Sequence, residues 1–168
     1  MIYGITDAGD STFYSEEFTV NSTATFLVQS MGELWYWTNN TFNDYGWIEN
    51  SSGDTVWTLK DYLSTMRVGD KTVFRMKLDA ITLEPGKYTL NYISDSKNSS
   101  GSLSEVEENK RRYGIQVYNL SFDNFQRFRN MINKELDRDL LAGMWYMNFI
   151  WIIKISGQQQ LMESTSLI

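Results

Sequence analysis

The sequence predicts a mainly β protein, an antiparallel β-sandwich of the immunoglobulin-like kind with one packed amphipathic helix. Short runs rich in aromatic and β-branched residues recur along the chain, and Gly, Asn and Ser separate them. Apolar and polar residues alternate within several of these runs, as they do in strands with one buried face. Short strands at this spacing are typical of sandwiches and barrels. At 168 residues, with 15% aromatic residues, the chain can bury a substantial core.

The expected strands follow one another from the amino terminus, with turn-forming residues between them. The pattern places them over residues 18–20, 25–28, 34–37, 55–59, 73–78, 88–92 and 113–118. Pro85 and Gly86 separate two of these alternating runs. Because proline presets φ and glycine accepts a positive φ, we expect a hairpin closed there by a type II turn.

The hydrophobic period changes after residue 120. Phenylalanines and aliphatic residues then recur every three or four positions from Phe122 to Leu140, which is the stripe of an amphipathic helix. Ser121 suits the N-cap and Gly143 suits the end of such a helix. We therefore expect a helix over residues 122–142.

A long strand is expected over residues 144–155, where every odd position from 145 is apolar. It would serve as an assembly strand through Trp145, Met147, Phe149, Trp151 and Ile153. Membrane association through 140–155 is the alternative. However, the run from Leu140 has only fourteen residues before Lys154, and a membrane-spanning helix needs about twenty. We expect one domain over 1–156 and a polar, flexible tail over 157–168.

The composition excludes several function classes. The chain has no Cys and no His, so it lacks thiolate ligands, disulfides and the commonest general base. Residues 1–104 carry thirteen acidic against seven basic residues, and this acidic field repels phosphate backbones. We expect no catalytic residues, no cofactor, no metal site and no nucleic-acid partner.

Two chemical alternatives rest on acidic residues. Carboxylate pairs could act as the acid and base of a glycosidase, which need a defined separation across a sugar. The candidates are Asp7 with Asp10, Glu16 with Glu17, and the group Asp44, Glu49 and Asp54. The loops 39–44 and 50–54 also hold oxygen ligands suited to calcium. Turn formation explains the composition of both loops equally well.

Tryptophan and asparagine residues indicate contacts with sugars. Aromatic rings could stack on a glycan at Trp35, Trp37, Trp47 and Trp57. Five Asn-x-Ser/Thr acceptors suit glycosylation in a secreted protein, at Asn21, Asn39, Asn50, Asn98 and Asn119. Because residues 1–4 do not begin a signal peptide, we expect a processed or excised piece of an extracellular protein.

Two segments resemble known extracellular domains. Residues 5–17, Ile-Thr-Asp-Ala-Gly-Asp-Ser-Thr-Phe-Tyr-Ser-Glu-Glu, resemble the opening of β-rich domains in cell-surface proteins of methanogenic archaea. Residues 83–90 are similar to a Pro-Gly-x-Tyr hairpin common in bacterial and archaeal extracellular β-sandwiches. The resemblance implies a location at the cell surface or envelope and carries no catalytic residues.

The sequence favours a non-enzymatic structural or interaction module of a cell envelope or extracellular assembly. Such a module could be a subunit of a surface layer (S-layer), sheath or filament, a self-assembling glycoprotein whose partners are copies of itself or other envelope proteins. Sheet edges and strands would mediate its subunit contacts. A glycan-binding module and a structural protein of a virion or tail are the alternatives.

Overall fold

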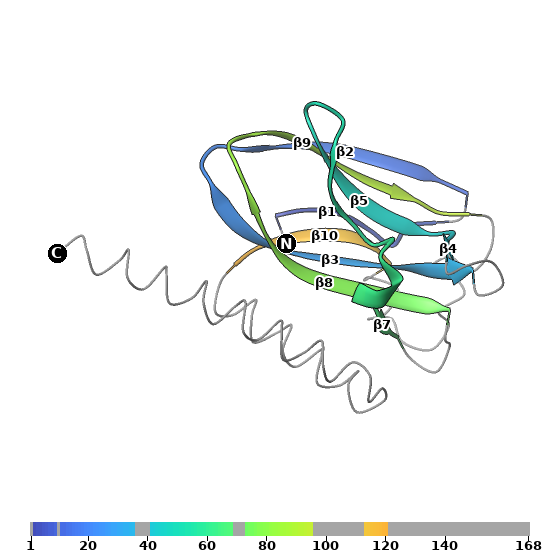
Figure 1. Ribbon diagram of the computed structural model, residues 1–168. Helices are drawn as coiled ribbons and strands as arrows, with labels where there is room; N and C mark the ends of the chain where they lie inside the picture. Colours follow the sequence, from blue (N-terminus) through green and yellow to red (C-terminus); the bar gives the residue numbers. More distant parts are fainter. Residues whose placement is uncertain (1, 10, 36–40, 69–72, 96–112, 121–168) are drawn as a thin grey trace.

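A computed structural model describes residues 2–9, 11–35, 41–68, 73–95 and 113–120 of the chain. Within these ranges the protein is mainly β, and two antiparallel sheets lie face to face (Figure 1). The prediction of a mainly β sandwich is therefore confirmed. The packed helix expected at 122–142, the strand at 144–155 with Trp145, Met147, Phe149, Trp151 and Ile153, and the tail at 157–168 lie outside the described residues.

The larger sheet has six strands. In spatial order these are β1 (Tyr3–Thr6), β10 (Gly114–Asn119), β3 (Ala24–Trp35), β8 (Phe74–Leu83) and β7 (Met66–Arg67), and β4 (Thr41–Phe42) pairs with the end of β3. The central strand β3 is twelve residues long and pairs with both β10 and β8. This sheet forms the lower layer in Figure 1.

The smaller sheet has four strands. In spatial order these are β2 (Phe13–Val20), β9 (Gly86–Ile93), β5 (Tyr45–Asn50) and β6 (Thr55–Thr58). A single 3-10 turn, η1 (Tyr62–Ser64), follows β6. The central strand β9 pairs with β2 on one side and β5 on the other, without a break in register.

A glycine marks the close approach of the two sheets. A Cβ atom at Gly46 would lie 2.7 Å from the Ile115 Cβ and 2.9 Å from the Ser30 Oγ. Gly46 on β5 therefore faces the six-stranded sheet, and Ser30 and Ile115 face β5 in return. Since side chains alternate along a strand, Tyr45 and Trp47 lie on the opposite, outer face of the four-stranded sheet.

The six-stranded sheet buries side chains on both of its faces. Ser30 and Ile115 lie on the inner face, so Met31 and its paired residue Met76 lie on the outer face. Both methionines are fully buried, as are further residues of that face, Leu27 and Leu78. Burial on both faces explains why Phe26, Leu27 and Val28 form a continuous apolar run without polar alternation.

The predicted hairpin at Pro85 is wrong. β8 ends at Leu83 in the six-stranded sheet, and β9 begins at Gly86 in the four-stranded sheet, so the turn connects the layers. Leu83 pairs with Ala24 and Gly86 pairs with Val20. Gly86 is not among the glycines with positive φ, so the expected type II turn is absent at this position. The alternation of apolar and polar residues indicates which side chains of a strand are buried, but it does not identify the strand with which it pairs.

Strand β5 is missing from the sequence prediction. Residues 43–46, Asn-Asp-Tyr-Gly, have the composition of a loop. In the structure Gly46 lies inside the strand because the opposing sheet leaves no room for a side chain there. The packing of the two sheets therefore requires glycine at position 46, and this glycine does not interrupt the strand.

Candidate functional site

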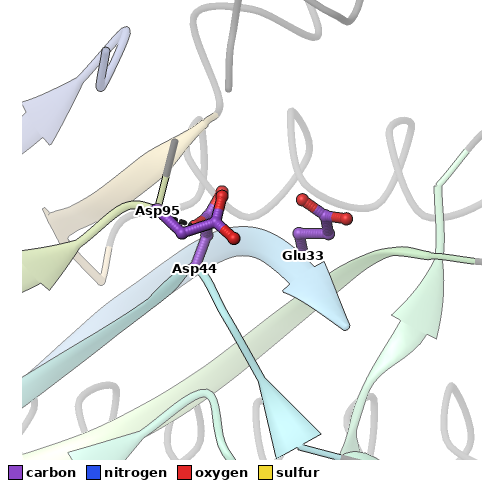
Figure 2. A group of neighbouring side chains, drawn as sticks. All are labelled: Glu33, Asp44 and Asp95. Carbon is purple, nitrogen blue, oxygen red and sulfur yellow. Dashed lines mark hydrogen bonds between the residues drawn. The ribbon is translucent and has the colours of Figure 1, made fainter. Parts of the chain in front are cut away.

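Three carboxylates converge where β3, β5 and β9 meet (Figure 2). Glu33 lies near the end of β3, Asp44 directly precedes β5, and Asp95 follows β9. One oxygen from each lies within 4.8 Å of the other two. Glu33 is 3% exposed and Asp44 is fully buried, whereas Asp95 is half-buried. We call these three residues the carboxylate cluster.

The backbone around Gly32 brings two of these residues together. The Glu33 amide donates a hydrogen bond to the Asp44 carbonyl at 3.1 Å, and the Asn43 amide donates to the Glu33 carbonyl at 2.9 Å. A Cβ atom at Gly32 would lie only 2.0 Å from the same Asp44 oxygen. Glycine at this position therefore allows the segment before β5 to lie directly against β3.

The Asp44 carboxylate connects three segments of the chain. Its Oδ1 accepts a hydrogen bond from the Asp95 amide at 2.6 Å, and its Oδ2 accepts one from the Tyr113 hydroxyl. Beside it, the Tyr92 hydroxyl donates to the Met31 carbonyl at 2.8 Å. The rings of Tyr92 and Tyr113 meet edge to face, with centroids 6.0 Å apart. Asp44 thereby fastens the start of β10 and the end of β9 to the start of β5.

Both tyrosines remain protonated over the ordinary pH range. Burial is the main reason that the pKa of Tyr113 lies well above its usual value, and the negative charge of Asp44 adds to this effect. Burial likewise raises the pKa of Tyr92, and the negative charge of Asp44 is the next largest cause. The two hydroxyls therefore act as permanent hydrogen-bond donors in the folded protein.

The carboxylate cluster has the oxygen chemistry that a hard cation prefers, and its spacing resembles that of a glycosidase pair. Its surroundings favour a structural role. Both oxygens of Asp44 accept hydrogen bonds from the protein itself, and the residue is closed to solvent. A carboxylate that acts on a sugar must reach its substrate. We therefore interpret the cluster as a buried connection between strands.

The other predicted carboxylates that the structure describes do not join the carboxylate cluster. Glu16 and Glu17 are exposed on β2, and Asp7 lies in an exposed turn with a φ of 55°. Glu49 accepts hydrogen bonds on the outer face of the four-stranded sheet, away from Asp44. Asp54 closes the turn after β5 by accepting a hydrogen bond from the Asn50 amide group. Asp10 lies outside the described residues.

Three aromatic rings form a continuous group on the outer face of the four-stranded sheet. Trp47 on β5 lies at the centre, with its ring centroid 5.1 Å from that of Tyr45 and 6.0 Å from that of Phe13 on β2. The interplanar angles are 33° and 36°. Phe13 is 59% exposed, and the other two side chains are half-buried. We call these three residues the aromatic platform.

Polar groups surround the aromatic platform. The Trp47 indole N–H donates to Glu49 Oε1 at 2.8 Å, and the Asn91 amide donates to Glu49 Oε2 at 3.3 Å. The Lys60 ammonium lies 4.0 Å from the centroid of the Tyr45 ring, within the range of a cation–π contact. The Glu49 carboxylate is thus held in one orientation at the margin of the rings.

Of the four tryptophans predicted for glycan stacking, the structure places Trp47 and Trp57 on opposite faces of the four-stranded sheet. Trp47 lies on the outer face of the four-stranded sheet, the position that stacking on a glycan requires. Trp57 faces inward, is only 5% exposed, and donates its indole N–H to Asp79 at 2.7 Å. The side chain of Trp35 and all of Trp37 lie outside the described residues. Trp47 was predicted from the sequence, whereas Phe13 was not, because Phe13 precedes the first residue expected to be in a strand.

The glycosylation acceptors occupy different environments. Asn21 follows β2 and Asn119 ends β10, and both are exposed. Asn50 instead stabilises a turn, because its Oδ1 accepts hydrogen bonds from the backbone amides of Ser52 and Asp54 at 2.9 Å each. Asn39 and Asn98 lie outside the described residues.

Strand β2 is an open edge of the four-stranded sheet. Its eight residues pair with β9 on one side, and none of the described strands pairs with the other side. The other described edge strands, β1, β6 and β7, have four, four and two residues. Edge strands in proteins are commonly short or interrupted, so the length of β2 is notable.

The chain matches no protein-family model, and comparison with curated proteins finds no relative. Among the described residues, no helix has the length and apolar character needed to cross a membrane.

Proposed function

We propose that this protein is a non-enzymatic interaction module of a cell envelope or extracellular assembly, built on an immunoglobulin-like sandwich. It associates with neighbouring subunits by strand addition at the open edge of β2. The observation that supports this proposal is an eight-residue edge strand with an uninterrupted register and no described partner on its outer side. An open strand of this kind is a template for backbone hydrogen bonding with another chain.

The hydrogen-bond pattern identifies which backbone groups of β2 face outward. The Ser94 amide donates to the Thr12 carbonyl at 2.9 Å, and these two residues continue the register of β2 with β9. Bonded and non-bonded pairs alternate along an antiparallel ladder. Even-numbered residues of β2 therefore bond to β9. The N–H and C=O groups that point away from β9 belong to Phe13, Ser15, Glu17 and Thr19.

Charge on the edge restricts which pairings are favourable. Glu16 and Glu17 are both exposed, and charged residues protect edge strands from indiscriminate association. In a two-fold antiparallel pairing centred on Ser15, Glu17 lies opposite Phe13 of the second copy, so the two Glu17 carboxylates do not face each other. This register avoids placing like charges directly opposite one another. We propose it for self-association of the module.

The proposed location at the cell surface rests on two further observations. Residues 5–17 resemble domains of archaeal cell-surface proteins, and this segment leads into β2 itself. Asn21 and Asn119 are exposed acceptors for glycans. A surface layer, sheath or filament subunit would use such an edge to contact copies of itself or other envelope proteins.

The experiment replaces Glu17 with proline in the complete chain. Proline removes the outward N–H and keeps the β2–β9 ladder, because position 17 does not donate to β9. We expect the wild-type protein to form assemblies that grow with concentration in sedimentation velocity experiments, and Glu17→Pro to remain monomeric. Glu17→Ala is the matched control, since it removes the charge but keeps the N–H, and it should still assemble.

A second proline tests the assignment of the edge. Glu16→Pro removes an N–H that bonds to β9, so it should lower the thermal midpoint, whereas Glu17→Pro should leave the circular dichroism spectrum unchanged. Assembly of Glu17→Pro to the same extent as wild type, or a monomeric wild type at all concentrations, would contradict the proposal.

A further inference from the structure

We propose that the outer face of the four-stranded sheet is a saccharide-binding site, with the aromatic platform of Phe13, Tyr45 and Trp47 as its floor. This inference goes beyond strand addition at β2, and the two surfaces share only Phe13. It rests on the orientation of the three rings, on the polar groups beside them, and on the limited area that they offer.

The rings of Phe13 and Trp47 approach each other across β9. Phe13 lies opposite Tyr45 across Ile93 of β9, and Trp47 lies two positions further along β5, so the Phe13 and Trp47 backbones are more than about 10 Å apart at the usual strand spacing and rise. Their ring centroids are nevertheless only 6.0 Å apart. The side chains must therefore lean toward each other over β9. Asn91 on β9 also points to the outer face, since it pairs with Trp47, yet it is only 3% exposed. The rings that lean over β9 account for its burial.

An exposed aromatic ring face suits the apolar face of a sugar ring. The face of an aromatic ring carries negative charge density, and the axial C–H groups of a pyranose present partial positive charge to it. Trp47 lies between the other two rings at interplanar angles of 33° and 36°, and Phe13, at 59%, is the most exposed of the three. The Phe13 ring and the accessible part of Trp47 can contact a sugar ring.

Hydrogen-bonding groups lie where the hydroxyls of such a sugar would project. Glu49 uses both carboxylate oxygens to accept hydrogen bonds from Trp47 and Asn91, and each oxygen retains a further lone pair. These lone pairs can accept hydrogen bonds from sugar hydroxyls. Lys60, held over Tyr45, supplies a donor on the same side. The platform thus combines ring faces with a fixed acceptor and a cationic donor, which together complement a polyhydroxylated ring.

The exposed area favours a small ligand over a protein. A stable protein interface buries about 800 Å² on each partner. An entire aromatic side chain buries about 150–250 Å², and two of the three rings here are already half-buried. The platform therefore falls well below the area that a protein partner needs, but it matches the size of one or a few sugar rings.

Isothermal titration calorimetry of the complete chain tests the proposal with three soluble probes: cellohexaose, mannohexaose and chitotriose. We expect at least one probe to bind, and Trp47→Ala to lower its association constant at least tenfold. Phe13→Ala provides a second variant on another strand, which keeps the test informative if Trp47→Ala does not fold. It should lower the association constant about two- to tenfold, the range expected for one aromatic contact. Leu63→Ala removes an exposed apolar side chain elsewhere and should bind as wild type does.

Two variants distinguish saccharide binding at the aromatic platform from assembly at the edge of β2. Glu17→Pro should bind the saccharide as tightly as wild type even where it abolishes assembly, and Trp47→Ala should assemble as wild type does. Failure of all three probes to bind, or binding that persists unchanged in both platform variants, would overturn the proposal. Loss of assembly in Trp47→Ala without any saccharide binding would assign the platform to a protein contact and would also overturn it.

Discussion

The hydroxyl of Tyr113 donates a hydrogen bond to the carboxylate of Asp44, a residue 69 positions earlier in the chain. This contact joins the start of β10, in the six-stranded sheet, to the segment that leads into β5, in the four-stranded sheet. The cluster of carboxylates around Asp44 is thereby a link between the two layers of the sandwich.

The first prediction concerns this link. Tyr113→Phe removes the hydroxyl and with it the hydrogen bond that Asp44 Oδ2 accepts from Tyr113. We expect the free energy of unfolding to fall by about 1.5–3 kcal/mol, the usual contribution of a hydrogen bond to a charged group. Urea denaturation followed by circular dichroism measures this change. Tyr45→Phe, on the outer face, should change it by less than about 0.5 kcal/mol. An increase in the free energy of unfolding for Tyr113→Phe would contradict a stabilising role for the hydrogen bond between Tyr113 and Asp44.

The second prediction concerns alkaline pH. Burial raises the pKa of both Tyr92 and Tyr113 in the folded protein above the usual value of about 10. Above pH 10 the unfolded chain loses these two protons while the folded protein retains them. Stability is therefore unaffected below pH 10 and falls as the pH rises further, by up to about 1.4 kcal/mol per pH unit for each tyrosine.

Denaturation curves at pH 9, 10 and 11, with absorbance at 295 nm to follow tyrosinate, measure this effect. The two buried tyrosines should ionise only as the protein unfolds, and Tyr92→Phe should flatten the decline. Reversible ionisation of all ten tyrosines in the folded protein would contradict the burial of this pair.

The third prediction concerns the contact between the sheets at Gly46. Gly46→Ala would bring a methyl group within 2.7 Å of the Ile115 Cβ, so one of the sheets must shift. We expect a loss of at least about 1–3 kcal/mol in unfolding free energy, the range found for overpacked cores. Gly86→Ala is a matched control, because the nearest atom to its new Cβ would be 3.7 Å away. Equal stability of the two variants would contradict the close approach of β5 and β10.

The fourth prediction concerns the outer face of the six-stranded sheet. Its buried residues Leu27, Met31, Met76 and Leu78 require a cover, and the sequence pattern at 122–142 predicts a helix with an apolar stripe of matching character. We expect a chain that ends at residue 120 to bind the dye ANS and to aggregate, since a large apolar face would be exposed. A soluble monomer of the shortened chain, with an unchanged circular dichroism spectrum and no dye binding, would contradict this expectation.

The strands were predictable where alternation or an aromatic run was clear. The runs that identify β2, β6 and β10 in the sequence correspond to strands in the structure. β5 was not predicted, because it lies between the two expected loops 39–44 and 50–54, and the need for glycine at position 46 depends on Ile115 in the other sheet. The pairing of β9 with β2 was also beyond prediction, since the short connection at Pro85 suggested that β8 was its neighbour.

The candidate sites were predictable only in part. Trp47 was recognisable as an aromatic residue near polar groups, but its alignment with Phe13 depends on β9 lying between their strands. The convergence of Glu33, Asp44 and Asp95 gave no sequence signal, because their separations depend on how β3, β5 and β9 meet. Sequence spacing carries information within a strand, whereas these sites form between strands.

Pairing at the edge of β2 is the central claim, and a spin label at position 15 tests it most directly. The chain has no cysteine, so Ser15→Cys provides a single attachment site, and Leu63→Cys provides an exposed control away from the edge. In a pairing centred on Ser15 the two labelled backbones lie about 5.5 Å apart. We predict strong dipolar broadening of the electron paramagnetic resonance spectrum in Ser15→Cys assemblies and little broadening in Leu63→Cys assemblies. Assemblies in which the label at position 15 stays mobile and shows no broadening would contradict pairing through β2.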